Sequence, residues 1–555
     1  MAFAKGDMVA RSQPKKAKTK RVKTTAKEAV SASSVADLCE VAPDSHHELV
    51  FGLIGPAGTD LKLVFRLLKQ ELQRVGYKVP KEEIRLSNLI QEFTGRSFSG
   101  LSEDQRINKL MDAGTELRDT CGRGDAVALL GLLEIERIRN AEFKGKPEKN
   151  AFVIHSLKRP EEVETLRAVY GKGFFAISVF SPREARVEAL ASRIGRSKPH
   201  HPGGAKAKAE ELVERDELEE NKPLGQKVRD VFPQADLFLD VRDRASLEAN
   251  IQRFIELVFG HPFHTPTREE YGMFHARAAA LRSSDMGRQV GATISTAEGD
   301  VIAVGCNDVP KAGGGLYWPG DERDARDFQR GGDTSIEHRQ QIVAELMGRL
   351  NEGGLLTANC QASNPNDLAD DLLFGKQKKV LKGSQLLNLL EFGRSVHAEM
   401  AALMDSARRG VSVKGAILYT TTYPCHLCAK HIVAAGIDRV IYVEPYPKSK
   451  ARDFYSDSIA SDPVRISDGA VVFESFVGIA PRAYSELFEM RDADARKNKY
   501  GKMIEWSANN ARPKFQRHIN THLLLETWLI ANDIKVMKQR WTDEQAKKQT
   551  KEKTK

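Results

Sequence analysis

The sequence predicts an α/β protein with two domains, each built on a β-sheet covered by helices. In the first half, short apolar blocks alternate with long helical patterns, which is typical of a parallel sheet. In the second half, a β-hairpin pattern comes before alternating helices and strands, which indicates a mixed sheet. The length of 555 residues allows more than one apolar core, since a domain takes about 100–200 residues.

The elements of the first half begin with an apolar run at residues 49–54. This run meets a glycine turn at 55–60, and a helical pattern then continues to about Val75. Further strands are expected at 151–154, 174–180 and 237–240, and helices at 106–140, 182–194 and 246–259. The charged, glycine-containing segment 196–222 predicts a mobile lid or a surface insertion. Residues 261–266 predict a linker, because their prolines stop helices and block sheet pairing.

The second half begins near Tyr271 and contains no internal repeat. A long polar insertion at about 311–385 separates its first elements from the rest. The expected elements are a helix at 273–283, a hairpin of 291–295 and 301–305, a helix holding His397 and Glu399, a strand at 416–420, a helix from about Cys425, and strands at 440–443 and 470–473.

The net charge of +9 is concentrated in two lysine-rich segments. Residues 1–27 carry nine Lys/Arg and one Asp, and residues 538–555 carry seven Lys/Arg and three acidic residues, so they contribute +8 and +4 and the rest of the chain carries −3. Both segments are expected to be disordered. Their charge favours solubility or nonspecific contact with polyanions, and docking of RNA or DNA remains the alternative.

The composition excludes membrane and secreted classes. The mean hydropathy is −0.43, and no apolar run approaches the roughly 18 residues of a membrane span. The basic segment 1–27 lacks the apolar core of a secretory signal. Six cysteines in 555 residues fit a reducing compartment, where a close pair is more often a metal site than a disulfide. We therefore expect a cytoplasmic protein with no membrane association.

The chemistry is concentrated in two short motifs, H-x-E at residues 397–399 and P-C-x-x-C at 424–428. His397, Cys425 and Cys428 offer one imidazole and two thiolates, a ligand set suited to tetrahedral Zn²⁺. Three protein ligands leave the fourth position for water, which indicates a catalytic site. Cys425 begins a predicted helix, whose N-terminus stabilises thiolates. Glu399 is close enough to reach the water without binding the metal, so it is the expected general acid/base.

Together these motifs resemble those of the zinc-dependent nucleobase deaminases. The alternatives are a closed zinc knuckle, which needs a fourth protein ligand, and a redox cysteine pair. His426 and His431 are the nearby candidates for that ligand, and we expect both to be bystanders.

Other segments of this half resemble the deoxycytidylate deaminases, namely residues 280–285, 288–292, 304–310 and 473–479. The resemblance implies that Asn307 binds the deoxyribose of the substrate. Cys306 and Asp308 depart from the tyrosine and glycine usual in that family. The alternative for Asn307 is a turn residue that caps its own backbone.

Over residues 48–490 the chain resembles the bacterial anti-phage dCTP deaminases. That resemblance implies an N-terminal P-loop-kinase-like domain with a parallel sheet, followed by a cytidine-deaminase-type α/β/α domain with a mixed sheet. It also implies action on free deoxycytidine nucleotides, which depletes the dCTP pool that a phage needs. Some members are held inactive by a small inhibitory RNA.

The glycine turn departs from the P-loop pattern G-x-x-x-x-G-K-[ST], because Thr59 and Asp60 follow Gly58 and the lysine is missing. Backbone N–H groups around Gly55, Gly58 and Thr59 can still bind the phosphate of a nucleotide. We expect binding without phosphoryl transfer, and a purely structural turn is the alternative. The arginines at 183, 186 and 215 either line a phosphate cleft or are ordinary surface.

The sequence thus predicts a zinc-dependent enzyme that hydrolyses the exocyclic amine of dCTP or dCMP. The alternatives are a deaminase of single-stranded polynucleotides and a nucleotide-sensing protein. We expect a homo-oligomer. The expected organisation is a basic arm (1–47), a P-loop-like domain (48–260), a linker (261–270), a deaminase domain (271–490) with an insertion (311–385), a helical extension (491–537) and a basic tail (538–555).

Overall fold

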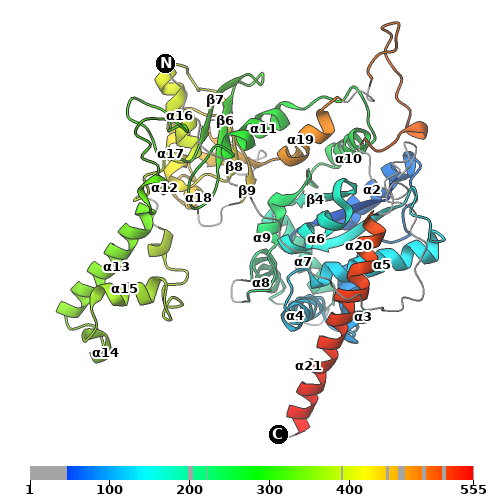
Figure 1. Cartoon of the computed structure of the whole chain (residues 1–555), viewed down its shortest axis with the longest axis horizontal. Coiled ribbons are helices and arrows are strands. Elements are labelled where there is room, and N and C mark those ends of the chain that lie inside the picture. The colour runs from blue at the N-terminus through cyan, green and yellow to red at the C-terminus, as the bar shows by residue number, and fades with distance from the viewer. Residues whose placement is uncertain are drawn as a thin grey trace, which may run out of the picture.

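The computed structural model describes residues 47–197, 204–219, 222–388, 392–445, 449–460, 469–490, 495–514 and 521–553. These residues form two six-stranded sheets with helices on both faces of each (Figure 1). The α/β class is confirmed. The basic arm predicted at 1–47 lies, except for its last residue, outside the described residues.

The first sheet has the strand order β12-β5-β4-β1-β3-β2. Its strands are β1 (Leu49–Ile54), β2 (Ile84–Arg85), β3 (Ala151–Leu157), β4 (Phe174–Phe180), β5 (Leu237–Asp240) and β12 (Gly478–Ile479). The first five are parallel, and β12 is antiparallel to β5 at the edge. All four strands predicted in this half are confirmed. That this domain is P-loop-like stays a prediction.

The side chains of β1 point alternately to the two faces of the sheet and divide the apolar core into two layers. Val50 and Ile54 belong to one apolar cluster, and Leu49, Phe51 and Leu53 belong to the other, because successive side chains point to opposite faces. The first cluster is covered by α3 (Leu86–Thr94), α4 (Glu103–Cys121), α5 (Ala126–Glu142) and α6 (Pro160–Tyr170). The second is covered by α2 (Leu61–Arg74), α10 (Arg244–Val258) and α19 (Pro481–Phe488).

One prediction in this half needs correction, and the structure adds detail to another. The stretch 106–140 is two helices, because Gly122 takes a left-handed conformation (φ +68°) and ends α4. The segment 196–222, predicted to be a mobile lid or a surface insertion, contains a packed helix in its described part. There α8 (Ala205–Glu217) packs against α7 (Arg183–Ser197), and both contribute buried apolar residues to one cluster. A short helix, α9 (Val228–Val231), follows.

The second sheet has the order β10-β11-β9-β8-β6-β7. Its strands are β6 (Gly291–Ser295), β7 (Val301–Cys306), β8 (Ile417–Thr422), β9 (Arg439–Glu444), β10 (Ile459–Ala460) and β11 (Val471–Ser475). The hairpin β6–β7 and the pair β6–β8 are antiparallel, and the other pairs are parallel, so the predicted mixed sheet is confirmed. Helix α11 (Arg268–Ala280) covers one face, and α16 (Ala398–Arg409) and α17 (His426–Ala434) cover the other. A short helix, α18 (Ala451–Phe454), lies beside α17.

Close contact between β7 and α16 fixes the helix that carries Glu399. A Cβ on Gly305 would lie 2.3 Å from the carbonyl oxygen of Ala398 and 2.4 Å from the backbone nitrogen of Ala402. Only glycine therefore allows α16 to lie this near the strand.

The insertion forms a helical arm with a small core of its own. Its helices are α12 (Asp327–Arg330), α13 (Thr334–Glu352), α14 (Ala358–Gln361) and α15 (Pro365–Leu373). Figure 1 shows α13 and α15 side by side, projecting away from the second sheet. Val343, Ala344 and Ala369 are buried between them. The predicted polar segment is thus folded and amphipathic.

Strand β12 joins the two sheets. It lies within the predicted deaminase domain but pairs with β5 of the first sheet. Next to it, Glu270 is fully buried and accepts a hydrogen bond from the Ile479 backbone at 2.8 Å. Arg253, from α10, forms a bidentate ion pair with Glu270 at 2.7 and 2.8 Å. An apolar cluster that includes Phe238 and Tyr419 spans the same junction.

Residues beyond 520 pack on α4, α5 and α6 of the first domain as α20 (Thr521–Leu529), a π-helical turn (Ile530–Ile534) and α21 (Lys535–Lys553) (Figure 1). The expected disorder of the basic tail is wrong, because α21 is helical to Lys553. Its side chains contact α4: Arg540 donates to the Cys121 carbonyl at 2.6 Å, and Lys548 pairs with Glu116 at 2.6 Å. None of the helices in the described part of the chain is both long and apolar enough to cross a membrane.

A buried ionic network ties α20 to the first domain and should make stability depend on pH. Arg139 pairs with Glu48 and Glu526, each at 2.8 Å, and His522 lies 3.1 Å from Glu48. Burial alone would raise the pKa of Glu48, but hydrogen bonds with His522 and Arg139 outweigh it and hold the pKa below its ordinary value. A lowered carboxyl pKa contributes stability above the unfolded pKa, about 4.3.

We therefore expect the free energy of unfolding to fall as pH decreases from 6 through the range below about 4.3. Glu48→Gln should flatten this dependence, and the exposed Glu82→Gln should not. Urea unfolding at a series of pH values measures both. Equal slopes in the wild type and Glu48→Gln would contradict the role of Glu48.

Candidate active site

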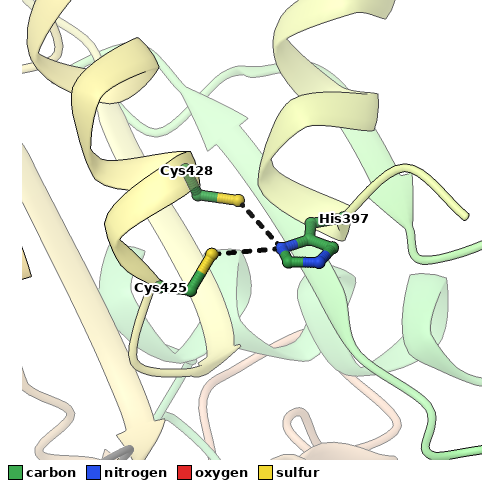
Figure 2. Close-up of side chains that lie close together, drawn as sticks. All are labelled: His397, Cys425 and Cys428. Carbon is green, nitrogen blue, oxygen red and sulfur yellow. Dashed lines mark hydrogen bonds between the residues drawn. The ribbon is translucent and has the colours of Figure 1, made fainter. Parts of the chain in front are cut away.

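Two helix N-termini bring three metal-binding side chains together. His397 is the N-cap residue of α16, and Cys425 is the N-cap residue of α17, with Cys428 in the first turn of α17. Figure 2 shows both sulfur atoms pointing at one edge of the imidazole ring. The His397 Nδ1 atom lies 3.2 Å from Cys425 Sγ and 3.4 Å from Cys428 Sγ.

These separations fit a tetrahedral zinc site. Bonds of about 2.3 Å to sulfur and about 2.0 Å to nitrogen place nitrogen and sulfur about 3.5 Å apart. The three ligand atoms all lie within 4.8 Å of one another. Neither His426 nor His431 belongs to this group in the described residues, so the closed knuckle gains no support.

Glu399 lies beside the three ligand residues and is almost fully buried. The Cys428 Sγ atom donates to its Oε2 at 3.5 Å. Burial, and then the negative charge of Cys425, raises the pKa of Glu399 above its ordinary value. A raised pKa makes this carboxyl group a better proton acceptor than an exposed glutamate, which suits a general acid/base.

A cavity of about 430 Å³ opens in front of these residues. Asn307, predicted to bind substrate, lines it, but its side chain also holds the neighbouring loop. The Oδ1 atom accepts from the Val290 backbone at 2.7 Å, and Nδ2 donates to the Arg288 carbonyl at 2.8 Å. Substrate binding by Asn307 stays a prediction, and so does the alternative, because these bonds join Asn307 to a separate loop and not to the backbone of its own turn.

The insertion supplies part of the cavity wall, which the sequence did not reveal. Asp327, Asp333, Ser335 and Arg339 come from it, and Arg288 and Arg394 line the same cavity. Arg394 pairs with Asp327 at 2.6 Å. The Nε atom of Arg339 is buried without a hydrogen-bond partner among the described residues. The only sequence signal for these additional cavity residues was the position of Arg394, three residues before His397.

The predicted nucleotide-binding residues of the first domain also lie together. Gly55, Gly58 and Thr59 follow β1, the central strand, and line a separate cavity of about 220 Å³. Ligands of parallel α/β sheets bind at this carboxyl edge. Asp60 is not among the residues that line this cavity, and its side chain caps α2 by accepting a hydrogen bond from the Leu63 backbone N–H at 3.0 Å. Of the arginines considered, Arg186 and Arg215 form ion pairs with acidic side chains.

Comparison with known proteins defines the class of the second domain. Residues 266–444 match the family model of the cytidine and deoxycytidylate deaminase zinc-binding region. The second half of the chain therefore contains a cytidine/deoxycytidylate deaminase-like domain, and its cofactor is zinc.

Individual relatives are similar to this chain over stretches of different length. The deoxycytidylate deaminase of Enterobacteria phage T4 is 46% identical over 55 residues, 10% of this chain and 28% of the relative. The chain thus spans less than a third of that relative. Human deoxycytidylate deaminase is 23% identical over 210 residues, 38% of this chain and 79% of the relative. A solved structure of the dCMP deaminase from cyanophage S-TIM5 with dCMP and dUMP is 18% identical, covering 38% of this chain and 98% of its own, with a TM-score of 0.22.

Proposed function

We propose that this chain hydrolyses the exocyclic amine of free deoxycytidine nucleotides, converting dCTP to dUTP and dCMP to dUMP. The observation that carries the proposal is the convergence of His397, Cys425 and Cys428 beside a buried Glu399, in a cavity that also contains arginines. This arrangement combines a metal site, a proton carrier and cations suited to a phosphate group.

Each residue has a defined role in the proposed reaction. His397, Cys425 and Cys428 hold zinc, which when bound supplies the Lewis acidity that lowers the pKa of a water molecule. Glu399 accepts one proton of the attacking water and passes it to the pyrimidine ring nitrogen, and it then transfers the second proton of that water to the exocyclic amine, which leaves as ammonia. Burial of Glu399 keeps this proton exchange away from bulk solvent.

The shape of the cavity favours a free nucleotide over a polynucleotide. The insertion closes one side of the cavity through Asp333, Ser335 and Arg339. The cavity therefore has the walls of a small-molecule site. The chain outside its two basic segments carries −3, which does not favour a groove for a nucleic-acid backbone.

The cellular role proposed with this activity is anti-phage defence by depletion of dCTP in the cytoplasm. It rests on the resemblance over residues 48–490, which also supports control by a small RNA. A homo-oligomeric assembly is part of the same proposal.

A substrate panel tests the activity. Purified zinc-loaded protein is incubated with deoxycytidine, dCMP, dCTP, CMP, CTP and single-stranded DNA and RNA oligonucleotides, and uracil-containing products and ammonia are measured. We expect product from dCTP and dCMP. Deamination of oligonucleotides with none of the free nucleotides would replace this proposal with the polynucleotide alternative.

A substitution of Arg339 tests how the insertion contributes to nucleotide binding. We expect Arg339→Ala to raise the KM for dCTP about tenfold or more with kcat changed less than about threefold, since losing a charged contact to phosphate weakens binding but leaves the reacting groups in place. The control is Arg349→Ala on the same helix, an exposed residue paired with Glu345 at 2.7 Å. An unchanged KM in Arg339→Ala would exclude contact with the nucleotide.

A further inference from the structure

The glycine turn of the first domain already holds a carboxylate. Asp216, from α8, is 1% exposed and its Oδ2 atom accepts a hydrogen bond from the Ala57 backbone N–H at 2.6 Å. The same oxygen lies 2.9 Å from Lys158 Nζ, and Lys158 Nζ also donates to the Gly55 carbonyl at 3.0 Å. One negatively charged side chain therefore contacts both the turn and a lysine.

The donors around Asp216 are those that bind phosphate in other proteins. They are a backbone N–H of a glycine turn, a helix N-terminus and an ammonium group. Gly58 has φ +94°, and a Cβ there would lie 2.6 Å from the Arg186 carbonyl oxygen, so the turn requires glycine. Lys158 follows β3, the neighbour of β1, and brings a positive charge to the turn although no lysine follows Gly58.

Two buried polar atoms at this place lack partners. Among the described residues, neither Asp216 Oδ1 nor Thr59 Oγ1 has a hydrogen bond. Both residues line the cavity of about 220 Å³. Leaving buried oxygens unpaired is unfavourable, so the contact between Asp216 and the turn satisfies only part of the site.

Beyond the turn the cavity has an apolar side and a polar side. The apolar side includes Leu86, Ile90, Leu110, Met111 and Val127, and the polar side includes Arg118, His155, Glu162, Arg193 and Gln226. A phosphate-bearing compound with both an apolar and a polar part matches this division.

We propose that the glycine turn and Lys158 form a binding site for the phosphate group of such a compound, and that the Asp216 carboxylate competes with phosphate for it. This inference goes beyond the proposed deaminase activity and does not depend on it. It concerns binding only, because Asp60 caps α2 and no hydroxyl or lysine follows Gly58 in the positions that phosphoryl transfer uses.

Asp216 is held in place by the packing of its helix. Leu212 and Val213 of α8 are buried against α7, and the flanking Arg215 and Glu217 pair with Asp112 and Arg186, each at 2.7 Å. A phosphate must therefore displace an anchored carboxylate, which weakens its apparent affinity for the wild type.

Inorganic pyrophosphate is the probe, and the zinc-loaded full chain is the protein. Asp216→Asn keeps the side-chain shape and removes the negative charge. We expect isothermal titration calorimetry to show at least about tenfold tighter pyrophosphate binding to Asp216→Asn than to the wild type. Adding Lys158→Gln to this variant should abolish the gain. Adding Arg339→Ala should leave it, because that residue belongs to the deaminase cavity.

The control for charge alone is Asp230→Asn, a surface substitution that should leave pyrophosphate binding as in the wild type. Equal pyrophosphate affinity of the wild type and Asp216→Asn would show that Asp216 does not compete with phosphate. A gain in affinity that persists after Lys158→Gln is added would show that phosphate does not bind at Lys158. If Asp216→Asn proves unstable, hydrogen exchange of the wild type replaces it. Millimolar pyrophosphate should then speed exchange in α8 but not in α13, and unchanged exchange in α8 would refute the proposal.

Discussion

Replacing Glu399 with glutamine should lower the rate of deamination of dCTP by about 10²–10⁴-fold while zinc content stays near that of the wild type. Glutamine keeps the size of the side chain but cannot accept or release the proton. The three metal-binding atoms belong to other residues, so the metal site should survive. Steady-state kinetics and metal analysis by mass spectrometry on the same preparation give both quantities.

Asp405→Asn is the matched control, since Asp405 lies on the same helix and pairs with Arg408 and Arg409 at the surface. It should keep the wild-type rate. A Glu399→Gln protein that retained more than a few per cent of the rate would remove Glu399 from the mechanism. Loss of zinc in that variant would instead make Glu399 a ligand.

Cys428→Ala should lose zinc and activity together, and Cys425→Ala should do the same. Removing one of three protein ligands leaves too few to hold the metal tightly. The site also links the N-termini of α16 and α17, so we expect a lower melting temperature than for the wild type. Metal content, dCTP turnover and thermal unfolding followed by circular dichroism test the three effects.

Cys306→Ala separates these effects from the general loss of a buried thiol. Cys306 is equally buried, at the end of β7, and is not part of the group of converging ligand atoms. This variant should keep its zinc. Full zinc occupancy in either Cys425→Ala or Cys428→Ala would show that the ligand set is wrong.

The long strands could be predicted because their apolar runs are continuous, and the short ones could not. Residues 49–54 and 174–180 are mostly apolar and coincide with β1 and β4. Strands β2 and β12 have two residues each, too few for any pattern. Helix α21 was missed for another reason: its sequence is strongly polar, and it is tied to α4 by contacts with residues about 420 positions earlier.

The same contrast holds for the site residues: some lie in local motifs that the sequence shows, and others come together only in the folded chain. His397, Glu399, Cys425 and Cys428 lie in two short motifs whose spacing predicts their chemistry. Arg339 comes from the insertion and reaches the cavity because the start of α13 lies against it. Lys158 and Asp216 are 58 positions apart, and no local pattern indicates that they meet at the glycine turn.

The strand β12 and helix α20 have a consequence for how the chain folds during synthesis. Domains usually fold in order as they leave the ribosome. Here β12 can pair with β5 only after residue 479 has been made, and the buried Arg139 can pair with Glu526 only later still. Until then the edge of β5 is open, and an open strand edge can pair with other chains. The first domain therefore stays incomplete while the whole deaminase domain is translated. During this interval, aggregation or chaperone binding competes with folding.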